Sequence, residues 1–542
     1  MTRHFQTVRT LLAACLLALF APAALAAQGV TTGFIRGQVT DENGNPLAGA
    51  QVGATNTATS FRGTAVTGAD GTYTVRLLPP GTYRVTASQL GRASGTANVQ
   101  VVVGAGATAN LRLTPEAVAV TGITATAARG SNTVDATEGG VQEAVSREQI
   151  ENLPSLGRDF TDFINLSGLV APDPGTTTGG QFSIAGQRAS QTNLLIDGVD
   201  ANNSFFGENR GGARIPFAFS LESIREFQII TNGYDVEYGS YSGGVVNVVT
   251  RGGTNKFEGT AYGNYRSDAL TGKNFEGTEP VEDYSVTQYS ARVSGPIKRD
   301  KAFFLLSLDG QRRREPQLPV TLSRYAPGGA EENAAVFTDI QRFFNILETK
   351  YGVNNAAGGY TPFQTSNDVI TLFGRVDLNL GENNRLTLRH NYSNYTNGNE
   401  FDAGFDFIYG LSRAEQFRDR SHSFVGELQS ILGGSTFNTL RFQFADEARP
   451  RNGNELRPAL IVNLTGGERI GYGGTFVSFQ NDLDERKLQV IDNLTHVAGD
   501  HTLKVGGNLI YTRIHNQFIS NGAGEYSFAN LDAFEAFNPT SY

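Results

Sequence analysis

The side chains best suited to chemistry are scattered along this sequence of 542 residues. Five of the six histidines lie far apart in its C-terminal third: His390, His422, His496, His501 and His515. The sequence contains no HExxH zinc motif, no GxSxG nucleophile motif, no Walker phosphate loop and no paired metal-ligand spacing. Single histidines on strands or in turns usually belong to the packing of a fold, so the sequence predicts no catalytic residue, no metal site and no cofactor.

Three aspartates that could act as acids, bases or calcium ligands lie in segments rich in turn residues. Asp41 opens the stretch DENGNP. Its glycine falls at the fourth position and no glutamate closes a twelve-residue calcium loop, so the pattern indicates an ordinary turn. Asp197 precedes Gly198, which is typical of a tight hairpin turn, and Asp200 also suits a turn better than acid–base work.

The composition favours β structure and excludes some partners. The chain has 64 Gly, 35 Phe and 19 Tyr but one Met, one Cys and no Trp. Glycine, aromatic and β-branched residues without strong helix formers predict a mainly β protein. The formal net charge of -9 gives no basic surface, so nucleic acid is not an expected partner.

The N-terminus has the pattern of a secretory signal peptide, over residues 1–26. Arg3 and Arg9 precede an apolar run at 11–19, and Ala-Leu-Ala at 24–26 supplies small residues for cleavage. Cys15 lies in a stretch that resembles a lipoprotein cleavage box, but too little apolar sequence precedes it. Removal of the signal would leave no cysteine. No later run reaches the roughly 18 apolar residues of a spanning helix, so any membrane span must be a β-barrel.

Residues 33–114 read as short strands separated by turn clusters, which predicts an antiparallel β-sandwich. The words GQVTDENGNPLAGAQV and GADGTYTVRLLPPGTYRVTAS resemble the carboxypeptidase regulatory-like domain. Residues 115–133 follow as a linker of small residues. It contains one apolar and β-branched patch, made of Ala117, Val118, Ala119, Val120 and Thr121. Such a patch can add as a strand to the sheet of another protein; it can also be plain linker or the last strand of the sandwich.

Residues 134–253 combine short helical and strand signals, which predicts a small α+β domain. Ser146 is a plausible N-cap of a first helix, and residues 221–227 give a further helical signal. The segment ends with a buried strand at 245–250, followed by Arg251, Gly252 and Gly253. Glycines here would permit a sharp reversal, so we expect a hinge at the domain boundary.

From residue 254 to 542 the sequence alternates apolar and polar residues over long segments. Strands are expected near 256–267, 285–297, 302–313, 368–380, 385–396, 421–431, 436–447, 486–497 and 502–514. Short and long connections alternate strictly, which is typical of an antiparallel transmembrane β-barrel with short periplasmic turns and long extracellular loops. A plugged transporter barrel has about 22 strands. Nine strands therefore predict a fragment lacking on the order of 400 residues of a longer protein.

One long loop carries a predicted helix at 333–351 with apolar residues at helical spacing: Val336, Phe337, Ile340, Phe343, Phe344 and Leu347. Such a stripe most often packs on neighbouring segments. Covering the barrel mouth and contacting a ligand are the other two interpretations.

Three further stretches resemble the plug domain of TonB-dependent outer-membrane receptors, in particular the Oar-like branch with its N-terminal carboxypeptidase regulatory-like domain. They are IENLPSLGRDF, FSIAGQRASQTNLLIDGVDANNSFF and IREFQIITNGYDVEYGSYSGGVVNVVTRGGTNKFEGTAYGNYR. The resemblance implies that residues 117–121 are a TonB box. It also implies a barrel filled by the plug, in the outer membrane of a Gram-negative bacterium.

By this resemblance the protein binds an extracellular ligand and imports it with energy transmitted by periplasmic TonB. The ligand, a siderophore, an oligosaccharide or a peptide, cannot be read from the sequence, and its binding residues stay unknown. The main alternative is an outer-membrane adhesion or assembly protein that keeps the architecture without active transport. A secreted enzyme and a passive porin fit less well, because zinc ligands are absent and a plug-like segment is present.

Overall fold

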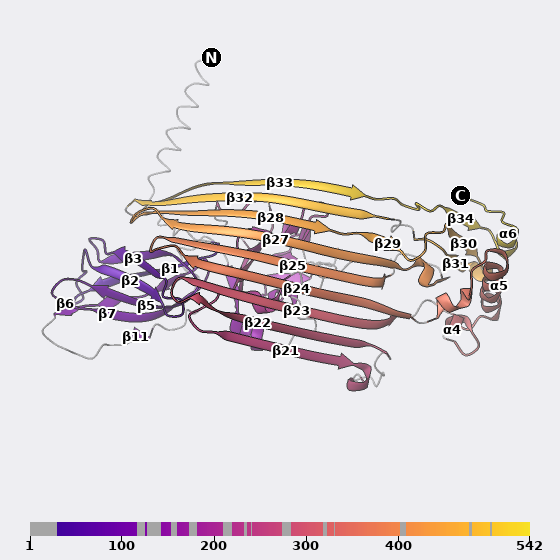
Figure 1. Cartoon of the computed structure of the whole chain (residues 1–542), viewed down its shortest axis with the longest axis horizontal. Helices are drawn as coiled ribbons and strands as arrows, with labels where there is room; N and C mark the ends of the chain where they lie inside the picture. Colours follow the sequence, from indigo (N-terminus) through magenta and orange to yellow (C-terminus); the bar gives the residue numbers. More distant parts are fainter. Residues whose placement is uncertain are drawn as a thin grey trace, which may run out of the picture.

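The computed structural model describes residues 30–115, 125–126, 142–152, 160–172, 182–209, 219–231, 236–239, 241–273, 283–317, 322–329, 331–361, 363–400, 408–475, 480–498 and 501–542. Four parts make up the molecule: an N-terminal sandwich, an inner domain, a long antiparallel sheet that we call the wall, and a cluster of loops. The sandwich and the loop cluster lie at opposite ends of its long axis, and the inner domain lies beside the wall between them (Figure 1). The predicted signal peptide and the predicted TonB box, residues 117–121, lie outside the described ranges.

The sandwich consists of two sheets with an apolar core between them. Its main strands are β1 (Gly33–Thr40), β2 (Gln51–Asn56), β3 (Arg62–Val66), β4 (Thr72–Leu78), β5 (Gly81–Ser88) and β7 (Gly95–Val101). Side chains alternate between buried and exposed along β5, as the period of two requires. The stretch at 41–46 is a turn, in which the Asp41 carboxylate accepts hydrogen bonds from the backbone N–H of Asn43 and Asn45, both at 2.8 Å. A hydrogen bond from the Asn45 side chain, together with these backbone bonds, holds the pKa of Asp41 below its ordinary value.

The inner domain is built on a five-stranded sheet with its own apolar core. The order is β12 (Gln142–Ser146), β19 (Ile224–Ile230), β20 (Val245–Thr250), β15 (Asn193–Ile196) and β16 (Val199–Asp200). Two short helices flank it, α2 (Arg147–Asn152) and α3 (Phe160–Ile164). All six residues of β20 are buried, which explains its valines; the polar Asn247 among them is hydrogen-bonded to the Val30 carbonyl.

The helix predicted at 221–227 is wrong. Only a 3-10 turn forms, η2 (Leu221–Ser223), and β19 starts directly after it at Ile224. The segment pairs with β12 on one side and β20 on the other. Pairing on both edges therefore overrides a local helical pattern.

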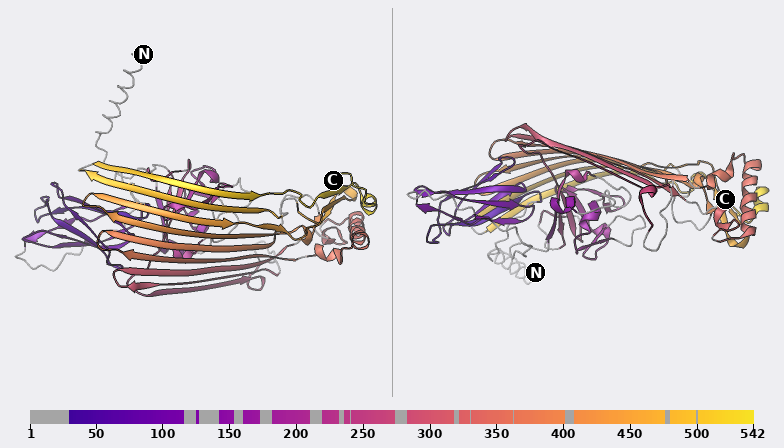
Figure 2. Two further views of the ribbon diagram at one scale, coloured as in Figure 1. Left: turned by 45° about the horizontal axis from the view of Figure 1, so that its top comes forward. Right: turned by 90° about the horizontal axis from the view of Figure 1, so that it is seen from below.

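The wall consists of nine long strands in chain order. They are β21 (Glu258–Ser267), β22 (Ser285–Lys298), β23 (Ala302–Gln317), β24 (Phe363–Asn379), β25 (Asn384–Glu400), β27 (Glu415–Ile431), β28 (Thr436–Ala448), β32 (Asp482–Ala498) and β33 (His501–Gln517). Each predicted strand is present and antiparallel to its neighbour. In the described part of the sheet β21 and β33 are the two edges, so the wall is open. Short turns lie at the sandwich end and long connections at the other, as Figure 2 shows.

The two faces of the wall differ in chemistry. On β25, Leu388 is 46% exposed and points outward, while the alternate residues Arg389, Asn391 and Ser393 are buried on the inner face. The inner domain lies against this inner face (Figure 2). An apolar outer face and a polar inner face are what a membrane-facing barrel wall requires.

The loop cluster is held together by a third large apolar core. Helix α5 (Ala334–Lys350) starts after its N-cap Asn333 and lies beside a small sheet of β26 (Ile408–Tyr409), β31 (Arg469–Tyr472), β30 (Ala459–Asn463) and β34 (Glu525–Phe528). The predicted helix at 333–351 is confirmed, and its apolar stripe packs on neighbouring loops. In the described ranges, no helix combines the length and the apolar character needed to cross a membrane.

Candidate functional site

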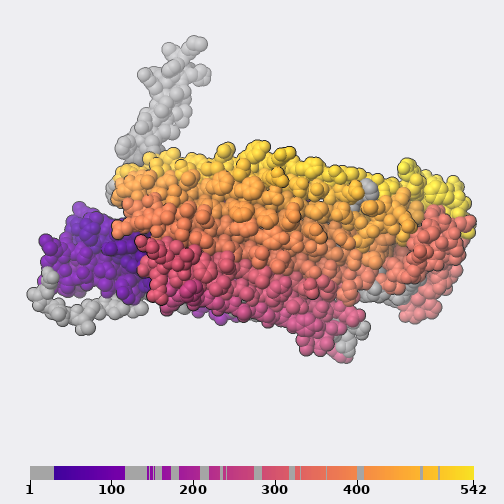
Figure 3. Space-filling model, viewed as in Figure 1, coloured from indigo at the N-terminus to yellow at the C-terminus, as the bar shows by residue number. Residues whose placement is uncertain are grey.

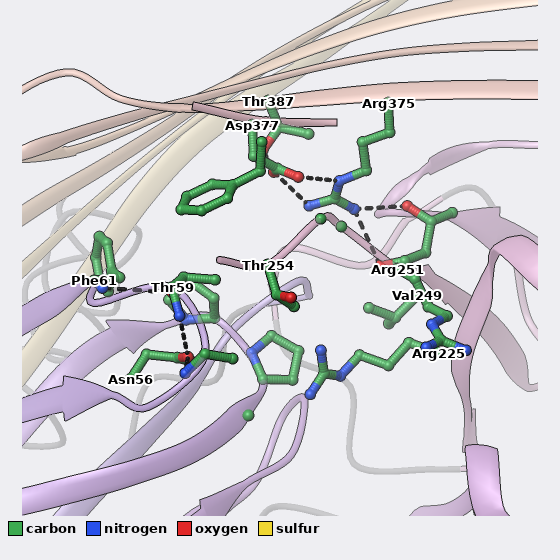
Figure 4. Close-up of a pocket in the computed structure, with 18 of the residues that line it drawn as sticks. Asn56, Thr59, Phe61, Arg225, Val249, Arg251, Thr254, Arg375, Asp377 and Thr387 are labelled. Atoms are coloured by element: carbon green, nitrogen blue, oxygen red, sulfur yellow. Dashed lines mark hydrogen bonds and ion pairs between the residues drawn. The ribbon is translucent and has the colours of Figure 1, made fainter. Parts of the chain in front are cut away.

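The chain passes from the inner domain to the wall through a junction that the sandwich also contacts. Strand β20 ends at Thr250, residues 251–257 cross over, and β21 begins at Glu258. Beside this crossing lies a cavity of about 270 Å³ that all three parts line (Figure 4). The site is thus formed where the predicted hinge residues meet the wall.

An arginine–aspartate cluster on the wall holds the end of β20. Arg375 on β24 donates from Nη1 to the carbonyl oxygen of Thr250 at 3.1 Å and to its hydroxyl at 2.6 Å. The same guanidinium forms two hydrogen bonds to Asp377, at 2.9 and 2.8 Å (Figure 4). Asp377 also accepts from Arg385 at 2.9 Å and from Thr387 at 2.8 Å. These bonds within the wall hold the side chains of Arg375 and Asp377 in the orientation in which Arg375 contacts the inner domain.

A second link joins the hairpin of β15 and β16 to the same place. Asp197 has a positive φ of 51° and Gly198 one of 76°, so the predicted tight turn is confirmed. The Asp197 carboxylate accepts from the backbone N–H of Thr250 at 2.9 Å and from its hydroxyl at 2.8 Å. It also pairs with Arg389 of β25 at 2.8 Å. Asp197 is thus a turn residue that also connects the inner domain to the wall.

The glycines of the predicted hinge touch the wall closely. A Cβ atom on Gly252 would lie 2.4 Å from a carboxylate oxygen of Asp377. One on Gly253 would lie 2.4 Å from the backbone oxygen of Phe304 and 2.9 Å from that of Gly295. Neither glycine has a positive φ. Glycine is needed here for close backbone approach, and the reason expected from the sequence, a sharp reversal, is wrong. The hinge role itself stays a prediction.

The sandwich contacts the other two parts at this end. The backbone N–H of Val103 donates to Glu226 Oε1 on β19 at 2.7 Å, and burial raises the pKa of Glu226. Next to the cavity, Asn255 donates from its backbone N–H to the Ala58 carbonyl at 2.9 Å. The Asn255 side chain bonds the Asp300 carboxylate in the first short turn of the wall, at 2.7 Å. One set of short contacts therefore links sandwich, crossing and wall.

The first described residues run between the inner domain and the wall. Asn247 on β20 donates to the carbonyl oxygen of Val30 at 2.5 Å. Thr31 donates its hydroxyl to Glu427 of β27 at 3.0 Å. Glu427 is itself paired with Arg441 of β28 at 2.6 Å.

Farther along the wall, the contacts with the inner domain are again polar. Lys487 pairs with Asp200, and Lys504 pairs with Glu237 at 2.8 Å. Ser220 donates its hydroxyl to Asp309. The apolar cluster shared by the two parts is small and consists of Val199, Val425 and Ile491. The inner face can therefore hold this domain in place through hydrogen bonds and ion pairs, with little shared apolar core.

The five histidines do not gather into a site. His390 and His422 lie on adjacent strands with Nε2 and Nδ1 3.2 Å apart, and His496 bonds Thr436 at 2.9 Å. His501 and His515 lie on β33. Within the described ranges no group of three His, Cys, Asp or Glu side chains could hold a metal ion.

Sequence reasoning missed Arg375, Asp377 and Arg389 as the residues that hold the inner domain. Their signal was present: charged residues stood at alternate positions of wall strands, where the inner face was expected. The sequence could not show which residue each one contacts, because Thr250 and Arg375 are 125 positions apart.

Three family models match the chain. Residues 34–114 match the carboxypeptidase regulatory-like domain, residues 133–246 the TonB-dependent receptor plug domain, and residues 249–364 and 340–538 an outer membrane β-barrel domain. The barrel match alone spans more than half of the sequence. The chain belongs to the TonB-dependent outer-membrane receptors. Its place is accordingly the outer membrane of a Gram-negative bacterium, and the inner domain is the plug.

The chain is similar to several individual proteins. The TonB-dependent transporter Oar of Myxococcus xanthus is 31% identical over 284 residues, which is 50% of this chain and 26% of Oar. The structure of the outer membrane transporter YddB from Escherichia coli aligns with a TM-score of 0.49 at 14% identity, covering 68% of this chain and 48% of that one. The siderophore receptor PirA from Acinetobacter baumannii gives 0.44 at 16%, covering 69% and 48%.

The chain thus spans about a quarter of Oar and about half of each of these two solved structures. The domain limits set from the sequence, at 114, 133 and 253, stay predictions, as does the TonB box at 117–121.

Proposed function

We propose that the protein binds an extracellular ligand and imports it with energy transmitted by periplasmic TonB. The observation that carries this proposal is the polar character of the contact between plug and wall. An imported ligand needs a path through the lumen, so part of the plug must leave its position. Hydrogen bonds and ion pairs can be exchanged for water when this happens, whereas a shared apolar core would oppose it.

The predicted TonB box has a suitable position in the chain. Residues 117–121 follow the sandwich and precede the plug, and the sandwich lies at the end of the wall that carries the short turns (Figure 1). Short turns are periplasmic in outer-membrane barrels. A short apolar segment starting from this end could add as a strand to TonB. A pull on it would reach the plug through β12, the plug's first described strand.

The ligand would bind at the other end, among the loops and the outward face of the plug. Its class stays open among siderophore, oligosaccharide and peptide. In this proposal the protein itself catalyses no covalent step.

Site-specific cross-linking tests the proposed partner without knowledge of the ligand. The only cysteine of the sequence is Cys15, in the predicted signal peptide. Ala119→Cys would then place one thiol at a known position, in a full-length receptor from which any other cysteine has been removed. We expect a disulfide with a cysteine placed in the periplasmic domain of TonB, and no such product from a matched Ala48→Cys variant in the sandwich.

Transport is tested separately by deletion of residues 117–121. Growth of the deletion strain on candidate nutrients should then equal that of a strain without the receptor. Unchanged nutrient accumulation after this deletion would favour the adhesion or assembly alternative.

A further inference from the structure

The outer face of the wall carries arginines directly beyond its apolar band, toward the loop cluster. Six arginines on four strands make up this outer arginine row: Arg312, Arg314, Arg418, Arg420, Arg486 and Arg513. On β33, outward residues run from Leu503 through Leu509 to Tyr511, all between 59% and 68% exposed, and Arg513 comes next. Figure 3 shows the face on which these strands lie.

The height of the row follows from strand geometry. Ten residue steps separate Leu503 from Arg513, which is about 33 Å along a strand. At a tilt of about 40°, this corresponds to about 25 Å along the membrane normal, the height of the apolar band of an outer-membrane barrel. Arg513 therefore lies at the level of the lipid headgroups of the outer leaflet, on the side of the long loops.

The arginines form three close pairs of like charge. Arg312 and Arg314 lie two residues apart on the same face of β23, and Arg418 and Arg420 repeat this on β27. Arg486 and Arg513 are direct cross-strand partners. Like charges placed opposite each other destabilise a sheet unless an anion lies between them.

Carboxylates of the wall neutralise only part of this charge. Arg314 forms two hydrogen bonds to Asp368, at 2.5 and 2.9 Å, and Arg486 donates to Asp446 at 2.8 Å. In the described ranges the other four, Arg312, Arg418, Arg420 and Arg513, form no ion pair, although Arg312 lies directly across from Asp368 in the sheet. The inner face differs, because its Arg375, Arg389 and Arg441 are all paired with carboxylates.

We propose that the outer arginine row binds the phosphate groups of a phosphorylated glycolipid in the outer leaflet. The side chains point away from the lumen, so a transported ligand would not meet them. Residues two apart on one strand lie about 7 Å apart along the backbone, so their guanidinium groups can reach neighbouring phosphates, each of which accepts two parallel hydrogen bonds. Arginine is also the side chain whose planar fork matches phosphate geometry. The row thus anchors the receptor at a fixed depth, whether or not it transports.

Binding of fluorescent diphosphorylated lipid A to the detergent-purified full-length receptor tests this proposal. Arg312, Arg418, Arg420 and Arg513 are changed together to Gln. The control changes Lys298, Arg299 and Lys301 to Gln, which removes exposed charge from a short turn at the opposite end. We expect lipid A to bind about tenfold more weakly to the first variant or worse, and the control to stay within about twofold of the parent.

Equal binding by both variants and parent would overturn the proposal, and so would an equal loss in both variants. Displacement of lipid A by inorganic phosphate at the same concentration would also overturn it, because free phosphate would then be the ligand. Heat-modifiable gel migration reports whether each barrel is assembled. If the glutamine variant does not assemble, the four Arg→Lys changes replace it. They keep the charge but remove the planar fork, so we expect weaker binding than in the parent; unchanged affinity would contradict the proposal.

Discussion

The loop cluster and the contact between plug and wall both join segments that are far apart in the sequence, but they use opposite chemistry. In the loop cluster, Phe343 stacks on Phe534 with ring centroids 5.2 Å apart and meets Tyr360 edge-on. In the plug–wall contact, Arg375 and Arg389 bind the end of β20 and the hairpin before it. The first region buries aromatic rings, and the second pairs charges.

This difference predicts that the loop cluster stays assembled and that the plug can separate from the wall. Separating the aromatic core would expose large apolar surfaces to water at about 25 cal/mol per Å². Separating the plug from the wall exposes mainly groups that water can hydrogen-bond, so its net cost per contact is about 1 kcal/mol. We therefore expect the loops to move as one unit and the plug to be the part that is displaced.

Substitutions at Gly252 and Gly253 should give the largest effect, because the chain passes from the plug to the wall here and packs closely against wall atoms. A valine at either position would drive its side chain into Asp377 or the backbone of Phe304. We expect Gly252→Val and Gly253→Val to reduce assembled receptor to a small fraction, measured by heat-modifiable gel migration. Gly263→Val, whose Cβ would meet nothing within 4 Å, is the control. Normal insertion of both variants would remove this account of the crossing.

Removing one aromatic ring from the core of the loop cluster should give the second-largest effect. Phe343→Ala leaves a cavity in a fully buried site and should cost about 3–5 kcal/mol of local stability. Hydrogen exchange of α5 amides in the full-length receptor measures this. Phe537, which is 51% exposed, offers a matched Phe→Ala control with a small expected change. Similar exchange in both variants would mean that the core does not hold the loops.

Neutralising Asp197 should weaken the plug–wall contact by a smaller amount. Asp197→Asn preserves the turn, since asparagine accepts a positive φ, but it leaves Arg389 without its carboxylate. We expect a loss of about 1.5–3 kcal/mol, seen as faster exchange of β15 and β20 amides. Asp70→Asn in the sandwich is the control. Amide exchange of β15 and β20 at the parental rate would show that the charge pair contributes little to the stability of the plug–wall contact.

The contact between sandwich and plug should depend on pH through Glu226. Burial raises the pKa of this carboxyl, so the docked state holds a proton more readily than the free one. The contact is therefore strongest at low pH and weakens as the pH rises through the raised pKa. Exchange protection of the Val103 amide, corrected for its intrinsic rate, should fall accordingly. Glu226→Gln keeps an acceptor and should abolish the pH dependence; a persisting slope would assign it to another group.

A surface ion pair of the loop cluster should give the smallest effect. Arg342 bonds Asp532 at 2.6 Å and Glu535 at 2.8 Å, but all three are exposed. Arg342→Ala should change the stability of α5 by less than about 1 kcal/mol, and less at high salt. A loss as large as that of Phe343→Ala would contradict the contrast between packing and charge in this region.

Much of the wall could be predicted from the sequence, because a strand between lipid and lumen must alternate its side chains over many residues. The strand β3 leaves only a weak pattern in the sequence, since Arg62–Val66 is short and contains a glycine. The helix predicted at 221–227 failed because pairing partners on both edges are invisible in a local pattern. Inward charges such as Arg375 could have been noted, but their partners depend on how the plug is seated.

The central claim is that TonB displaces the plug from the wall, and a single thiol can report this in living cells. Val199 is 1% exposed and belongs to the small apolar cluster with Val425 and Ile491. In Val199→Cys receptors, we predict that a maleimide able to reach the periplasm labels this residue in energised cells. Labelling should fall to background in cells without TonB and after deletion of residues 117–121. Equal labelling with and without TonB would contradict the claim.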